Sequence, residues 1–101
     1  MIVINARIEA TQETVQALKQ AVLTMEAATK TESGCEDYTF SVEIGNPGAI
    51  RITERWATEA ALKAHFLTQH MATFQAAMKA HPPKGMDLHC YQAEEIPLPR
   101  P

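Results

Sequence analysis

The chain has 101 residues and a hydrophobic fraction of 46%, which suits one small globular domain and argues against disorder of the whole chain. Twelve acidic residues outnumber nine scattered basic ones, whereas nucleic-acid binding normally needs a clustered basic face. No apolar run approaches the roughly 20 residues of a membrane span, and the start MIVINARIEA lacks the basic region of a signal peptide. Two cysteines are too few for a disulfide framework, so we expect reduced thiols and a cytoplasmic location.

The N-terminal part of the chain predicts a strand followed by a long helix. Residues 2–9, IVINARIE, place apolar side chains at every second position, which is typical of a half-buried strand. Thr11 is suited to cap the helix that follows, and Gly34 in ESGC is free to adopt the left-handed conformation at its end. The predicted buried face of this helix repeats at spacings of three and four residues and consists of Val15, Leu18, Val22 and Met25.

The middle of the chain predicts a β-hairpin and then two helical segments. The alternating stretch DYTFSVEI at 37–44 is followed by the turn-forming GNPG, and AIRITERW at 49–56 returns as the partner strand. Thr58 is expected to cap a short helix that carries Phe66, and LTQH interrupts the pattern before the second segment. The paired prolines of HPPKG end that segment, because proline cannot continue a helix.

The C-terminal part completes the fold prediction. MDLHCYQAE predicts a last strand, and we expect a domain of residues 1–95 with an extended proline-rich tail at 96–101. The order β-α-β-β-α-β is that of the ferredoxin-like α+β fold, an antiparallel sheet with helices on one face. The other face mixes Val3, Asn5 and Arg7, although an open sheet face of a monomer should be cleanly polar. We therefore expect a homodimer that packs sheet to sheet around a partly polar cavity.

Three blocks of sequence together resemble the antibiotic biosynthesis monooxygenase family. They are the asparagine of the first strand, ESGC-x-x-Y after the long helix, and ERW-x-x-E-A-A-L-x-A-H with the H-x-x-x-F that follows it. The resemblance covers residues 1–95 and implies a dimeric α/β barrel. The family includes quinol monooxygenases that need no cofactor, haem-degrading enzymes, an isomerase of a small signalling sugar, and members of unknown role. It therefore implies a small aromatic substrate and O₂ as partners, with no cofactor.

Oxygenation without a cofactor requires a particular kind of pocket. A deprotonated phenol or hydroquinone can give an electron to O₂, so the protein must bind the ring, remove a proton, stabilise the anion and exclude water. Imidazole suits the role of base near neutral pH, which makes His65 the candidate base. The resemblance places Asn5 at a strand position where active members use an asparagine. It places Trp56 where haem-degrading members use a tryptophan against the ligand.

Further aromatic and imidazole side chains are candidates for contact with the substrate. Each candidate also has a structural interpretation, as a core residue, a wall residue or a hydrogen-bonded surface residue. Trp56 shares its strand face with Ile50 and Ile52, and if this is the face under the helices, the tryptophan belongs to the core. The candidate substrate-binding residues are Tyr38, Phe66, His70, Phe74 and Tyr91.

The spacing of the histidines does not predict a metal site. His65 and His70 are five residues apart, which on one continuous helix rotates them about 140° from each other. Zinc-binding helices instead use a pair four residues apart on one face. His81 and His89 are separated by the proline break, and no Cys-x-x-Cys accompanies any of them.

Two alternative functions stay open at the level of sequence. A haem-binding or haem-degrading enzyme needs an axial histidine and a roomy apolar cavity, and three phenylalanines with an aromatic fraction of 6% disfavour a large haem pocket. A dimeric small-molecule-binding module without catalysis is the other alternative, because every candidate residue also has a structural interpretation.

Overall fold

Four strands and three helices follow one another in the order β-α-β-β-α-α-β. The computed structural model describes all residues from Met1 to Pro101. This architecture is the predicted ferredoxin-like α+β fold, with the second helical region divided in two. The elements are β1 (Ile2–Glu9), α1 (Gln12–Thr29), β2 (Cys35–Glu43), β3 (Asn46–Trp56), α2 (Glu59–Phe66), α3 (Gln69–Ala80) and β4 (Gly85–Gln92).

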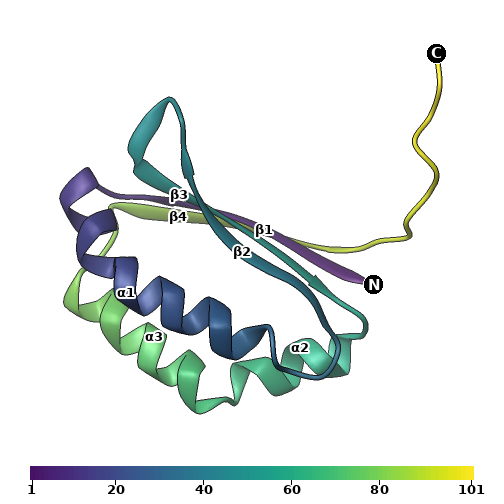
Figure 1. Ribbon diagram of the computed structural model, residues 1–101, viewed down its shortest axis with the longest axis horizontal. Helices are drawn as coiled ribbons and strands as arrows, with labels where there is room; N and C mark the ends of the chain where they lie inside the picture. Colours follow the sequence, from purple (N-terminus) through teal and green to yellow (C-terminus); the bar gives the residue numbers. More distant parts are fainter.

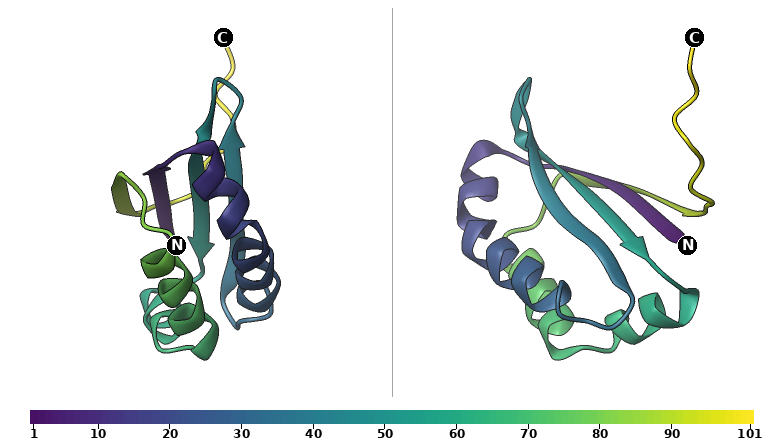
Figure 2. Two further views of the ribbon diagram at one scale, coloured as in Figure 1. Left: turned by 90° about the vertical axis from the view of Figure 1, so that its left-hand side faces the viewer. Right: turned by 45° about the vertical axis from the view of Figure 1, so that its right-hand side comes forward.

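The strands form one antiparallel sheet in the order β2-β3-β1-β4. All three helices lie on one face of this sheet (Figure 1), and the turned views of Figure 2 show the opposite face free of helices. In the register of the two central strands, Ala6 pairs with Ile52 and Ile8 with Ile50, and all four side chains are buried. The alternation predicted for residues 2–9 and 49–56 is therefore confirmed, and it turns the apolar residues toward the helices.

Helix α1 is capped at both of its termini. The Thr11 hydroxyl accepts a hydrogen bond from the backbone N–H of Thr14 at 3.1 Å, as expected of an N-cap. The helix is capped at its C-terminus by Lys30, so Gly34 lies farther along, in the turn before β2. Gly34 has a φ of +82°, and a Cβ there would lie 2.7 Å from the Cβ of Ala61. Both the backbone conformation and the close approach of α2 therefore require glycine.

The interruption predicted at LTQH divides the second helical region into α2 and α3. The Thr68 hydroxyl accepts from the backbone N–H of Met71 at 3.2 Å and donates to the backbone oxygen of His65 at 2.8 Å. One side chain thus caps the start of α3 and is tied to the last turn of α2. As a result, His65 and His70 lie on two different helices.

Strand β4 and the residues after it are the least covered part of the fold. Every residue of β4 is exposed, and β4 forms one edge of the sheet. The chain has no regular secondary structure after Gln92, and in Figure 1 its end runs away from the body of the molecule. None of the helices combines the length and the apolar character that crossing a membrane requires.

Candidate functional site

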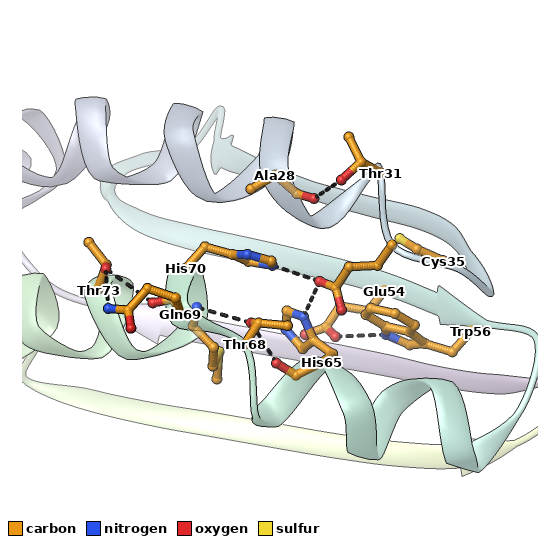
Figure 3. Close-up of polar contacts among 12 residues, drawn as sticks. Ala28, Thr31, Cys35, Glu54, Trp56, His65, Thr68, Gln69, His70 and Thr73 are labelled. Atoms are coloured by element: carbon orange, nitrogen blue, oxygen red, sulfur yellow. Dashed lines mark hydrogen bonds and ion pairs between the residues drawn. The ribbon is translucent and has the colours of Figure 1, made fainter.

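Two histidines from different helices meet one glutamate beneath the C-terminal end of α1. Glu32 lies in the turn that leads from α1 to β2, His65 in the last turn of α2, and His70 in the first turn of α3. The Oε2 atom of Glu32 lies 2.7 Å from Nδ1 of His65 and 2.7 Å from Nε2 of His70. Figure 3 shows the two histidines, His65 and His70, with dashed lines that mark these two contacts. The residue set Glu32, His65 and His70 is called the His–Glu–His cluster below.

The two histidines differ in their access to solvent. The side chain of His65 is 1% exposed, and its ring centroid lies 4.9 Å from that of Trp56 and 5.4 Å from that of Tyr38. The side chain of His70 is 23% exposed. A small molecule can therefore reach His70 directly, whereas His65 lies behind it, enclosed by aromatic side chains.

A pocket between α1 and α3 is lined in part by His70. It has a volume of about 310 Å³, and its lining includes Phe74 and Thr73 from α3 and Met25 from α1. This size and this mainly apolar lining with a few polar groups are typical of small-ligand sites. A second groove of about 220 Å³ lies between α1 and the β2–β3 hairpin, but no histidine lines it. Of these two hollows, only the pocket between α1 and α3 connects to the His–Glu–His cluster.

A buried carboxyl group, Glu54 on β3, lies next to the cluster. Its Oε1 accepts a hydrogen bond from Nε1–H of Trp56 at 3.0 Å. Burial raises the pKa of Glu54, although the Trp56 hydrogen bond and the nearby His65 both act to lower it. Burial, followed by the negative charges of Glu54 and Glu32, also raises the pKa of the Tyr38 phenol, so Tyr38 is a neutral wall residue.

Substitution of Glu54 should change how stability depends on pH. Because the pKa of Glu54 is raised in the folded state, the unfolded chain loses this proton first as pH rises, and folding becomes less favourable across that interval. Glutamine has no proton to lose and still offers an oxygen to Trp56. Glu54→Gln is therefore expected to raise the melting temperature at pH 8 on the order of 5 °C, which corresponds to about 1 kcal/mol for a domain of this size.

Thermal unfolding followed by circular dichroism from pH 4 to pH 8 measures this effect. The difference between wild type and variant should grow with pH and be smallest at pH 4. Glutamine in place of the exposed Glu36, which lies 3.6 Å from Arg55, is the control for loss of a carboxylate at the surface. A constant difference across the range would contradict the role of Glu54.

The structure divides the sequence-predicted site residues between the two faces of the sheet. Asn5 pairs in register with Thr53 and His89, and its side chain lies exposed on the face without helices. Its neighbours Ile4 and Ala6 are buried under the helices, because successive strand residues point to opposite faces. Within a single chain, Asn5 therefore lies on the opposite side of the sheet from Trp56 and His65.

The other candidates are placed as follows. Tyr91 also points to the helix-free face, and Phe66 on α2 is 52% exposed. Trp56 is completely buried, so its structural interpretation as a core residue is confirmed. The residues gathered on the helix side, around the cluster and its pocket, are Tyr38, Trp56, His65, His70 and Phe74.

Sequence reasoning missed Glu32, and it misjudged how the two histidines are related. The rotation of about 140° applies to a continuous helix, whereas Thr68 starts a new one between them. The signal for Glu32 was present, since this residue opens the ESGC block that carries the family resemblance. Nothing in that block indicates, however, that its glutamate faces two histidines more than 30 residues away.

Comparison with known proteins places this small α+β protein, with its helix-side pocket, in a family. The antibiotic biosynthesis monooxygenase family model matches residues 1–77. A proposed antibiotic biosynthesis monooxygenase from Deinococcus radiodurans is 25% identical, with all of both chains covered and a TM-score of 0.89. No protein in the curated set matches. The chain belongs to the antibiotic biosynthesis monooxygenase family.

Two further solved structures share the fold at lower identity. One is a proposed antibiotic biosynthesis monooxygenase from Caulobacter crescentus, with 23% identity, 93% of this chain and 90% of that chain covered, and a TM-score of 0.86. The other is a proposed antibiotic biosynthesis monooxygenase from Nitrosomonas europaea, with 17% identity, 92% and 98% coverage, and a TM-score of 0.85. Their likeness extends over nearly the whole chain and therefore supports the architecture as a unit.

Proposed function

We propose that this protein is a monooxygenase that oxidises a small phenol- or quinol-like compound with O₂ and needs no cofactor. The observation that carries the proposal is the hydrogen bond between Glu32 and His70, a histidine that lines the pocket between α1 and α3. Membership of the family supports the reaction class. The aromatic ring of the substrate would lie against Phe74, with a hydroxyl group directed at His70.

Within the proposed mechanism, Glu32 prepares His70 to act as the base. When Oε2 of Glu32 accepts from Nε2–H of His70, the neutral ring carries its lone pair on Nδ1, which forms no hydrogen bond within the chain. Proton uptake at Nδ1 makes an imidazolium that the carboxylate stabilises. His65 donates to the same oxygen from the enclosed side and holds the carboxylate in place. This arrangement gives the predicted base role to His70 and makes His65 a positioning residue.

The reaction balances without an external reductant. Proton removal leaves a phenolate, which gives one electron to O₂, and the resulting radical pair joins to form a C–O bond at a ring carbon. His70 returns its proton to that peroxide. The O–O bond then breaks as the same ring carbon loses its hydrogen, so one oxygen stays on the ring as a carbonyl and the other leaves as water with both hydrogens. A phenol thus becomes a quinone and a quinol becomes a hydroxyquinone, with the substrate supplying the electrons.

Oxygen uptake with a panel of phenols and hydroquinones tests the proposal. Chelator-treated wild-type protein should consume one O₂ per substrate molecule, and His70→Ala should lower kcat by a factor of about 10² or more. His81→Ala is the matched control, because His81 is an exposed histidine outside the pocket and should leave the rate unchanged. Equal rates for wild type and His70→Ala, or no turnover of any panel member, would contradict the proposal.

We also propose that the active form is a cytoplasmic homodimer that covers the helix-free face of the sheet. The edge strand β4 supports this, because Tyr91 points to the helix-free face and is about half exposed there. Asn5 lies on the same uncovered face as Tyr91, so any catalytic role for these two depends on the dimer. Size-exclusion chromatography with light scattering should give twice the chain mass of 11.2 kDa, and a monomer would contradict this proposal.

A further inference from the structure

We propose that the His–Glu–His cluster binds one divalent first-row transition-metal ion. Each of the three residues offers one ligand atom, and these atoms all lie within 4.8 Å of one another. Two imidazole nitrogens with one carboxylate oxygen form a donor set that holds Zn²⁺ in catalytic sites, and Fe²⁺ with open coordination positions in oxygenases. The inference rests on this geometry and is independent of the proposed oxidation.

The convergence of both rings on a single oxygen is the main argument. His65 and His70 do not share the two oxygens of Glu32 between them, since both lie 2.7 Å from Oε2. The three donor atoms therefore lie close together, and a metal ion placed among them would displace the ring protons that now bridge to Oε2. Metal–ligand bonds of about 2.0–2.2 Å place donor atoms roughly 3.0–3.5 Å apart. The two nitrogen–oxygen separations of 2.7 Å would then lengthen by less than about 1 Å, and the separation of the two nitrogens is already within 4.8 Å.

The surroundings allow that expansion and hold the ligands in place. Glu32 lies in a turn, where its side chain can withdraw without disturbing a helix. His65 is fixed by packing against Trp56, and the backbone of its helical turn is held by the Thr68 hydroxyl.

The position of His70 determines how a metal ion reaches the cluster and which hydrogen bond the ion must replace. This histidine lines the pocket between α1 and α3, so a metal ion can reach the cluster from there. Coordination through Nε2 of His70 replaces the hydrogen bond to Glu32. Metal binding and the base arrangement are therefore alternative states of the same three side chains, and added metal should inhibit any turnover that depends on that base.

The chain contains its own reporter for this test. Trp56 is the single tryptophan, and its ring centroid lies 4.9 Å from that of His65. Untagged, chelator-treated full chain is titrated with Co²⁺ while tryptophan fluorescence and visible absorption are recorded. We expect saturable quenching with a stoichiometry of one ion per chain, together with the Co²⁺ absorption bands of a nitrogen- and oxygen-ligated ion. Added Zn²⁺ should displace Co²⁺ and restore the fluorescence.

Substitution of the ligands tests whether the ion binds at this cluster. Glu32→Gln and His70→Ala should each weaken Co²⁺ binding at least about 10-fold while keeping the wild-type circular dichroism spectrum. His89→Ala is the matched control, because His89 forms another histidine–carboxylate pair, 3.1 Å from Asp87, on exposed β4. Absence of saturable binding by the folded protein, or an equal loss in His89→Ala, would overturn the inference. Turnover by the chelator-treated protein is a separate readout, so failure of the metal site and failure of the proposed function are distinguishable.

Discussion

Trp56→Ala is expected to lower the free energy of unfolding by about 3–5 kcal/mol, the usual cost of removing a large aromatic side chain from a core. Trp56 is completely buried, and it packs in the core cluster formed by Ile4, Met25, Tyr38, Leu62 and Phe74. Alanine leaves a cavity and also deprives the buried Glu54 carboxyl of its N–H donor. Folded domains have only about 5–15 kcal/mol of stability in total, so this single substitution removes a large part of it.

Urea denaturation followed by circular dichroism measures this loss, with Phe66→Ala as the control. Phe66 is an aromatic residue on the neighbouring helix α2 but is 52% exposed, so its truncation should cost less than about 1 kcal/mol. Similar losses in the two variants would show that Trp56 is not the centre of this core. Trp56→Phe separates packing from hydrogen bonding, because it retains most of the ring and deletes only the donor to Glu54. The destabilisation of this variant should be larger at pH 8 than at pH 4, because the ionised carboxylate of Glu54 is stabilised most by the hydrogen bond that is lost.

The alternation of apolar and polar residues along the strands made the sheet predictable from the sequence. In residues 2–9 and 49–56, once one apolar side chain is buried, the strand geometry determines to which face of the sheet each remaining side chain points. The pairing of Ala6 with Ile52 follows that alternation. The same rule placed Trp56 with Ile50 and Ile52 and so allowed it to be a core residue. It also placed Asn5 on the opposite face, where the side chain is exposed.

The site itself was only partly predictable, because it is made by tertiary contacts. His65 and His70 were both recognised as candidates, but their relation depends on the Thr68 cap, which places them on separate helices. Glu32 reaches them from a turn whose course is set by Gly34 and by the contact of that glycine with Ala61. No periodicity in the sequence encodes this convergence. The exposed fractions that distinguish His65 from His70 also arise only from packing.

Glu32→Gln is expected to lower kcat of the proposed oxidation by a factor of about 10²–10⁴, the range typical of general-base catalysis. Glutamine can still accept the hydrogen bond from Nε2–H of His70, but it has no negative charge to stabilise the imidazolium that forms when Nδ1 takes the proton. KM should change little, because Glu32 does not line the pocket between α1 and α3. The effect should therefore appear in the proton-transfer step and not in substrate binding.

Steady-state oxygen uptake in the presence of a chelator measures both constants without interference from bound metal. Glu36→Gln makes the same chemical change four residues away, at an exposed side chain whose nearest cation is Arg55 at 3.6 Å, and should retain wild-type kcat. If Glu32→Gln also retained wild-type kcat, the carboxylate would have no part in proton transfer. If instead KM rose while kcat held, Glu32 would act by shaping the pocket through the position of His70. A fall in kcat alone is the result that only a charged partner of the base explains.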